Sequence, residues 1–204
     1  MYKFDYYTEK DQQKVIDFVK ENAFALVTGI GEKYPVATQI PLAVEIIGGK
    51  IFFHGHLMRK TDHHLAFEKN EHVLVTFTGP HCFVSASWYS NSKVGSTWNY
   101  MTVQAKGKIR FTDEAGTYNA VKAVSDKYEG TKSAGAFDNL PKEYIDQMIK
   151  AIVGFTIEVE SMENTFKLSQ NRDEVSRRNI IKELMKRGDE NSGKIAAEML
   201  KRID

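Results

Sequence analysis

Residues 46–62 read Ile46-Ile47-Gly48-Gly49-Lys50-Ile51-Phe52-Phe53-His54-Gly55-His56-Leu57-Met58-Arg59-Lys60-Thr61-Asp62. Gly48-Gly49 between apolar residues is typical of a two-residue hairpin turn, so antiparallel strands are predicted on both sides of it. The second strand gives way to a short polar helix, and the side chain of Thr61 or Asp62 is predicted to cap that helix. The basic pair Arg59-Lys60 therefore lies where a strand ends and a helix begins.

Short strands and turns dominate the chain on both sides of this stretch. Strands are predicted over residues 24–28, 36–46, 51–54, 72–78, 82–85, 98–112, 153–160 and 166–168, with a turn at Gly79-Pro80. Helices are predicted over residues 8–22, 61–70, 115–128, 142–152 and, as a polar pair broken at Gly188, 173–204. This order differs from alternating βαβ units, so the fold class is predicted to be α+β. A small antiparallel barrel is the economical closure because it leaves few open sheet edges.

Several residues carry local predictions that bear on packing. The hydroxyl of Thr8 is predicted to cap the first helix, with Asp11 in its first turn. Leu65 and Phe67 are predicted to face inward from the second helix. Pro41 cannot donate a hydrogen bond to a neighbouring strand, so it predicts a bulge or a sheet edge with free backbone groups.

The composition is that of an ordinary globular domain. The 204 residues include 28 Lys and Arg against 27 Asp and Glu, a net charge of +1 that gives no general reason to expect nucleic acid as a partner. With 42% hydrophobic residues, disordered and fibrous classes are excluded. The single Cys82 excludes a disulfide framework. No apolar run approaches the roughly 18 residues of a membrane span, so a soluble cytoplasmic protein with no membrane partner is predicted.

The basic turn has the donors of an anion site. The guanidinium of Arg59 can bind a phosphate with two hydrogen bonds, and the ammonium of Lys60 can add a point charge. Thr61 and the first amides of the following helix can complete an anion nest. The alternative interpretation is an ordinary basic turn exposed to solvent.

Other residues suggest chemistry less specifically. His54 and His56 project from one face of a strand, but a third and a fourth ligand are missing, so no metal is predicted and each histidine is a core residue or a donor to a cofactor. The aromatic pair in Trp98-Asn99-Tyr100 can stack on a heterocycle or belong to the core. Cys82 is predicted to be a buried structural thiol.

Several motifs in a fixed order resemble the PaiB-type family of FMN-binding negative transcriptional regulators. They are Gly79-Pro80-His81, Ser87-Trp88-Tyr89, Thr97-Trp98-Asn99-Tyr100, Val153-Gly154-Phe155 and Lys167-Leu168-Ser169-Gln170-Asn171-Arg172. The family is similar to the FMN-binding split barrels, which form homodimers with FMN at the subunit interface. The resemblance implies an antiparallel FMN-binding split β-barrel with peripheral helices over residues 1–172, followed by a C-terminal helical extension over residues 173–204.

The resemblance also implies a set of cofactor-binding residues. Arg59 and Lys60, with Thr61, would hold the FMN phosphate, and His56 is a candidate donor to the cofactor. The backbone of Thr38, Gln39, Ile40 and Pro41 would run along the edge of the isoalloxazine ring. Trp98, Asn99, Lys167 and Gln170 would approach the flavin, from the same subunit or its partner. No catalytic acid or base is identified.

Three functions follow from these observations. The first is a dimeric FMN-binding negative transcriptional regulator, although the net charge and the missing helix-turn-helix pattern support DNA binding only weakly. The second is an FMN-dependent oxidoreductase acting on a small molecule, in which the flavin performs the electron transfer. The third is a haem-binding split barrel with His54 or His56 as the iron ligand.

Overall fold

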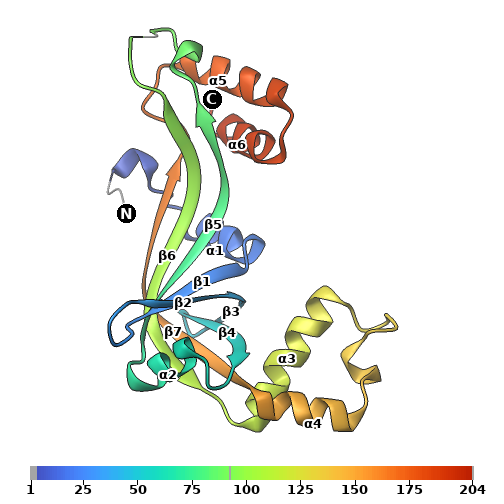
Figure 1. Ribbon diagram of the computed structural model, residues 1–204. Coiled ribbons are helices and arrows are strands. Elements are labelled where there is room, and N and C mark those ends of the chain that lie inside the picture. Colours follow the sequence, from blue (N-terminus) through green and yellow to red (C-terminus); the bar gives the residue numbers. More distant parts are fainter. Residues whose placement is uncertain (1–3, 92, 204) are drawn as a thin grey trace. The chain divides into compact units, whose positions relative to one another are not determined.

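The computed structural model of the protein describes residues 4–91 and 93–203 (Figure 1). Its helices are α1 (Gln12–Glu21), α2 (Asp62–Lys69), α3 (Glu114–Tyr128), α4 (Lys142–Ala151), α5 (Glu174–Arg187) and α6 (Glu190–Leu200), with the short 3-10 helices η1 (Asp5–Tyr7), η2 (Ala86–Trp88) and η3 (Phe137–Asn139). Its strands are β1 (Phe24–Gly29), β2 (Val36–Pro41), β3 (Ala43–Ile47), β4 (Lys50–Met58), β5 (His72–Val84), β6 (Thr97–Phe111) and β7 (Ile152–Lys167).

The strands form one sheet in the order β2-β1-β5-β6-β7-β4-β3. β1 pairs antiparallel with β2 and β5, and β4 pairs antiparallel with β3 and β7. The hairpin between β3 and β4 turns at Gly48 and Gly49, whose φ angles of 58° and 81° are readily adopted only without a Cβ atom. The predicted α+β class, the antiparallel sheet and the Gly48-Gly49 hairpin are therefore confirmed.

The chain divides into two compact units that interleave along the sequence. One unit holds the described residues up to Phe18, Thr78–Val103 and the described residues from Glu163 onward, and the other holds Val19–Phe77 and Gln104–Met162. We refer to them as the arm unit and the barrel unit, respectively. A boundary at residue 172 stays a prediction.

The barrel unit has an aromatic core. Phe53 of β4 and Phe77 of β5 are fully buried and meet edge to face, with ring centroids 5.1 Å apart. A Cβ atom at Gly55 would lie 2.9 Å from Leu42 and 3.2 Å from Ile40, so the end of β2 returns to β4. This close approach brings strands from the two ends of the sheet order together within the unit, as a barrel requires.

The arm unit has its own core, built largely from the C-terminal helices. α5 and α6 pack against each other and bury Ile180, Leu184, Ile195 and Met199. Gly188 separates the helices with a φ of 80°, the left-handed conformation that commonly ends a helix. The predicted break at Gly188 is therefore confirmed.

Two predictions about side chains were wrong. Asp11, rather than Thr8, caps α1, because Oδ1 of Asp11 accepts a hydrogen bond from the amide of Gln13 at 3.0 Å. The hydroxyl of Thr8 instead donates to the carbonyl of Phe4. In α2 Phe67 is buried as predicted, but Leu65 is 47% exposed, because two positions along a helix turn the side chain by more than half a circle.

Two predicted strand breaks were also wrong. β5 continues through Gly79-Pro80, and β7 runs without a break from Ile152 to Lys167. The pairing of β1 with β5 ends at Thr76, so Pro80 lies beyond it and its missing donor interrupts no bond to β1. Gly79 is needed for packing, because a Cβ atom there would collide with the ring of Phe18. Composition alone could not distinguish this close approach from a turn.

Candidate functional site

The turn between β4 and α2 has an unusual backbone. Lys60 has a φ of 63°, in the left-handed region that side chains with a Cβ atom avoid. Among the described residues other than glycine, only Lys60 and Ser169 have a positive φ. Strained residues of this kind persist where the surrounding structure holds them, and they cluster at ligand sites. The left-handed φ of Lys60 therefore favours a ligand site at the basic turn.

The backbone and one side-chain nitrogen of Arg59 are anchored to β7 and to the helix before it. Its amide donates to the carbonyl of Ala151 at 2.9 Å, and its Nε donates to the carbonyl of Ile152 at 2.8 Å. The two terminal guanidinium nitrogens have no hydrogen bond or ion pair with any residue that the structure describes, and the same holds for the ammonium of Lys60. The turn thus presents two cations without protein counter-charges.

Thr61 begins helix α2. Its hydroxyl accepts a hydrogen bond from the amide of His64 at 3.3 Å and donates its proton to the carbonyl of Met58 at 3.0 Å, so the predicted cap is confirmed. Because this single proton is used, Thr61 can offer an anion its backbone amide rather than its hydroxyl. Neither that amide nor the amide of Asp62 has an acceptor within the described part of the chain. Both lie at the positive end of α2.

The predicted ring segment lies in β2, which the sheet order places at one edge. Thr38 to Pro41 pair with Phe24 to Val27 of β1, so only one side of this segment is bonded to a neighbouring strand. α2 packs against β2 within the barrel unit. The structure thus brings the element that carries the basic turn and the predicted ring segment together. The sheet edge predicted at Pro41 is confirmed.

His56 of β4 lies on the opposite face of its strand from Gly55, which approaches β2. His56 pairs with Gly154 of β7, and a Cβ atom at Gly154 would lie 2.9 Å from Thr117 of α3. Paired residues share a face and successive residues alternate, so His56 faces α3 whereas Gly55 faces Ile40. Burial lowers the pKa of His56, and its Nδ1 is buried without a partner among the described residues. His56 thus faces away from β2, and a contact of His56 with the cofactor stays a prediction.

Two of the four predicted residues in the arm unit are used inside the protein. Asn99 is fully buried, accepts a hydrogen bond from the hydroxyl of Ser169 at 3.0 Å, and directs its Nδ2 at the sulfur of Met199. Gln170 accepts from the amide of Leu168 at 2.7 Å, and its Nε2 donates to the carbonyl of Phe166 in β7. Both amides therefore form hydrogen bonds within the arm unit, and flavin contacts by Asn99 and Gln170 stay a prediction.

The other two residues of that group are accessible. The ring of Trp98 is 54% exposed and lies edge-on to Phe83, with centroids 6.2 Å apart. The ammonium of Lys167 donates to the hydroxyl of Thr97 at 2.5 Å, and burial, assisted by the charge of Arg172, lowers its pKa. An exposed indole can stack on a planar ligand. Flavin contacts by Trp98 and Lys167 stay a prediction.

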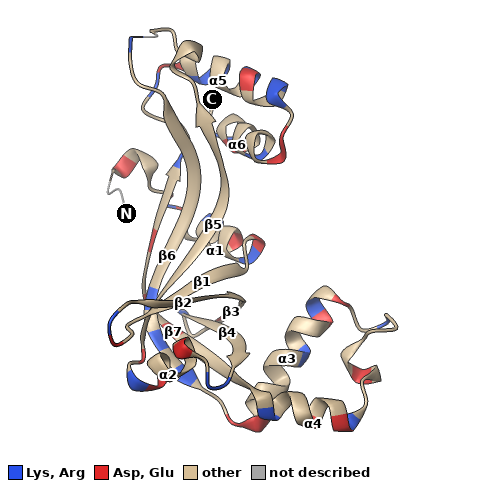
Figure 2. Cartoon of the chain, viewed as in Figure 1, with Lys and Arg blue, Asp and Glu red and all other residues tan. Residues whose placement is uncertain are grey.

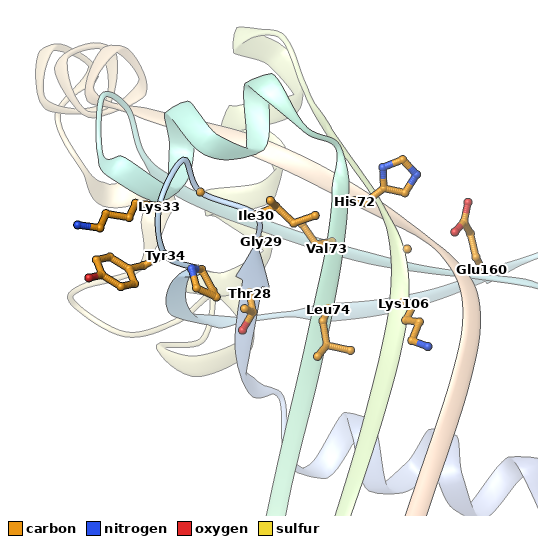
Figure 3. A pocket seen from close by; sticks show the side chains of 13 residues that line it. Thr28, Gly29, Ile30, Lys33, Tyr34, His72, Val73, Leu74, Lys106 and Glu160 are labelled. Carbon is orange, nitrogen blue, oxygen red and sulfur yellow. The ribbon is translucent and has the colours of Figure 1, made fainter. Parts of the chain in front are cut away.

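A pocket of about 560 Å³ lies elsewhere in the barrel unit (Figure 3). It is lined by residues from the end of β1 and the loop after it, from β5, from β6 and from β7, among them Ile30, Tyr34, Leu74, Lys106 and Glu160. None of the predicted cofactor residues belongs to it. No feature of the sequence indicated this pocket, because it forms only where the loop and strands β1, β5, β6 and β7 meet. The described residues contain no cluster of ligands for a metal ion.

Comparison with known proteins assigns the chain to a family. Residues 1–161 match the family described as "Putative FMN-binding domain". The chain belongs to this FMN-binding family. Over 200 residues it is 32% identical to the protease synthase and sporulation protein PAI 2 of Bacillus subtilis, an alignment that covers 98% of this chain and 96% of that protein. The PaiB-type resemblance is thereby confirmed, and FMN is the cofactor.

Solved structures confirm the split-barrel fold. The flavocytochrome Anf3 of Azotobacter vinelandii superposes with a TM-score of 0.62 at 17% identity, covering 81% of this chain and 72% of that one. The FAD and haem binding protein of Mycobacterium smegmatis gives a TM-score of 0.58 at 14% identity, covering 79% of this chain and 73% of that one. At these identities the likeness establishes the fold of this FMN-binding protein and no more.

The basic turn fits the phosphate group of FMN. A phosphate ester requires cations and hydrogen-bond donors, and the turn offers the unpaired Arg59 and Lys60 side chains together with the amides of Thr61 and Asp62. The turn also lies in the part of the chain that matches the FMN-binding family.

No helix among the described residues is long and apolar enough to cross a membrane.

Proposed function

We propose that this FMN-binding protein holds the phosphate of the cofactor at the turn between β4 and α2. The observation that carries the proposal is the pair of cations, Arg59 and Lys60, which lack protein counter-charges at the N-terminus of a helix. Arg59 supplies the two terminal nitrogens of its guanidinium as paired donors. The hydrogen bond from its Nε to the carbonyl of Ile152 holds the guanidinium group in place. Lys60 supplies a point charge, and the amides of Thr61 and Asp62 supply neutral donors.

We further propose that the free edge of β2 binds the rim of the isoalloxazine ring. The backbone groups of Thr38 to Pro41 that point away from β1 supply donors and acceptors at fixed spacing. In support, α2, which begins at the proposed phosphate site, contacts β2. Bound FMN supplies one- and two-electron transfer. The chain positions it through phosphate contacts at one end and backbone contacts along the ring.

Our proposal for the biological role is a homodimeric negative transcriptional regulator, as in the PaiB-type family. The support is the relation to PAI 2 along nearly the whole length of both proteins. In the homodimer, Trp98 and Lys167 are proposed to contact the flavin. The dimer is tested by light scattering of the FMN-loaded protein, where a mass of one chain overturns the proposal.

Regulation through another factor is favoured over direct DNA binding. α5 carries five basic residues against two acidic ones, and α6 carries one basic residue against two acidic ones. Arg178 and Lys194 form ion pairs with Glu174 and Glu190 at 2.7 and 2.6 Å, and both signs of charge occur on these helices (Figure 2). Over the whole chain the charges nearly cancel, to a net charge of +1, so the general attraction to DNA phosphates is weak. We expect transcripts repressed by the wild-type gene to rise when it is deleted, with no salt-dependent binding of their promoter DNA by the purified protein.

The phosphate site is tested with the double variant Arg59→Ala, Lys60→Ala. Charge-assisted hydrogen bonds contribute about 1.5 to 3 kcal/mol, so FMN affinity is expected to fall roughly 10- to 150-fold. Affinity is measured by the quenching of flavin fluorescence, and thermal unfolding of the cofactor-free protein checks the fold. Lys69→Ala at the exposed C-terminal end of the same helix is the matched control. Unchanged FMN affinity in the double variant would overturn the assignment.

A further inference from the structure

We propose that His64 is a positioning residue for the FMN phosphate, acting through the backbone of Lys60. This inference rests on the proposed phosphate site. The amide of Lys60 donates a hydrogen bond to Nδ1 of His64 across 3.4 Å. This hydrogen bond ties the amide of Lys60, and so the peptide unit before it, to the first turn of α2.

The left-handed conformation of Lys60 needs such support. A lysine at a φ of 63° brings its Cβ atom close to the following carbonyl, and only glycine escapes this cost. The conformation determines where the Lys60 side chain leaves the turn and where the amides of Thr61 and Asp62 point. A group that holds this φ therefore arranges the donors of the site without touching the ligand itself.

His64 is placed to act as a rigid acceptor. It is 5% exposed in the first turn of α2, and its ring packs against Phe111 of β6 with centroids 4.9 Å apart. Because Nδ1 accepts from the amide of Lys60, it carries no proton, and the proton of the neutral ring lies on Nε2. The nearest carboxylate oxygen to Nε2 is that of Glu68, 3.7 Å away on the same helix. Packing against Phe111 and the position in the helix fix the ring plane.

The Lys60-His64 contact explains why the polar ring of His64 is buried at the start of α2. A histidine is rarely buried in the first turn of a helix unless one of its nitrogens has a partner, and here that partner belongs to the strained residue. Nε2 is buried and has no hydrogen bond within the described residues. Burying this polar ring costs desolvation free energy, and the hydrogen bond from the amide of Lys60 to Nδ1 offsets part of that cost.

Variants of His64 separate positioning from general stability. His64→Asn keeps an acceptor near the position of Nδ1, whereas His64→Leu removes it. We expect His64→Leu to weaken FMN binding about tenfold, the value of one well-placed hydrogen bond, and His64→Asn to stay within about twofold of the wild type. Riboflavin, which lacks the phosphate, is the second probe, and its affinity is expected to be the same for all three proteins. Both affinities are read from flavin fluorescence quenching.

A double-variant cycle with Lys60→Gly adds a direct test. Glycine adopts the left-handed conformation without assistance, so His64→Leu is expected to cause no further loss of FMN affinity in the Lys60→Gly background. An equal tenfold loss in both backgrounds overturns the inference. An equal loss of FMN and riboflavin in His64→Leu also overturns it, because a phosphate-positioning role spares riboflavin.

Two further outcomes are distinguishable. If the Arg59→Ala, Lys60→Ala variant retains full FMN affinity, the phosphate site itself fails. If that variant loses FMN while His64→Leu does not, the site stands and the role of His64 fails. Should His64→Leu not fold, His64→Gln takes its place, because its side-chain oxygen lies one bond farther along and does not reproduce Nδ1. The comparison of His64→Gln with His64→Asn then carries the test.

Discussion

The hydroxyl of Ser169 donates a hydrogen bond to Oδ1 of Asn99 over 3.0 Å, joining residues that are 70 positions apart. Both side chains are buried, and Ser169 has a φ of 60°. The bond fixes the polar segment after β7 against β6 within the arm unit. Two of the motifs that identify the family therefore meet in a structural contact.

Asn99→Ala is expected to destabilise the protein without weakening FMN binding by the folded molecules. The substitution leaves the Ser169 hydroxyl buried without its acceptor, which costs about 1 to 3 kcal/mol of the free energy of unfolding. Urea unfolding measures this loss, and FMN titration measures the affinity. Asn119→Ala on the exposed face of α3 is the control, expected within about 0.5 kcal/mol of the wild type. Unaltered stability with reduced FMN affinity would identify Asn99 as a flavin contact.

Lys60→Gly is expected to stabilise the cofactor-free protein while weakening FMN binding. Glycine relieves the left-handed strain of about 1 to 2 kcal/mol but gains freedom in the unfolded chain, so a net gain of up to about 1 kcal/mol is expected. Loss of the ammonium reduces FMN affinity roughly tenfold or more. Lys60→Ala separates the two effects, because it removes the charge and keeps the strain. A glycine variant that is no more stable than the alanine variant would contradict the strain argument.

Cys82 is expected to resist thiol reagents in the native protein. Burial, opposed by the nearby charge of Arg187, raises the pKa of Cys82 to about 11, so the nucleophilic thiolate is nearly absent at neutral pH. Reaction with a coloured disulfide reagent at pH 8 is expected to follow unfolding, with rapid reaction in concentrated guanidinium. A free thiol of a small peptide is the control. Rapid modification of the native protein at the rate of the peptide would contradict this prediction.

Asp173 is expected to make stability depend on pH in the acid range. The amide and hydroxyl of Ser176 and the hydroxyl of Ser90 donate to its carboxylate, and these bonds lower the pKa of Asp173 to about 2 from 3.8. Because the pKa is lower in the folded state, the stabilisation is present above about pH 4 and is lost as the pH falls towards 2.

The variant Asp173→Asn isolates this contribution. The wild type is expected to have the higher urea midpoint at pH 6, and the difference between the two proteins is expected to shrink between pH 4 and pH 2. A difference that stays constant over this range would show that the carboxylate charge contributes nothing to the cap of α5.

Features set by neighbouring residues in the chain were predictable from the sequence by itself. Gly48-Gly49 forms the hairpin, Thr61 caps α2 and Gly188 separates the last helices, because backbone freedom and side-chain caps act within a few residues. The basic turn belongs to the same class, since a strand end and a helix start fix its place. The order of elements likewise disfavoured a doubly wound parallel sheet.

Tertiary structure alone decided which groups remain available to a ligand. The side-chain amide of Asn99 bonds to Ser169 and Met199 inside the protein, and His56 faces α3 rather than β2. The left-handed Lys60 could not be foreseen, because no glycine marks it and its support comes from the buried ring of His64. Burial and hydrogen-bond partners depend on packing between segments far apart in the chain, and a single sequence carries no direct record of those distances.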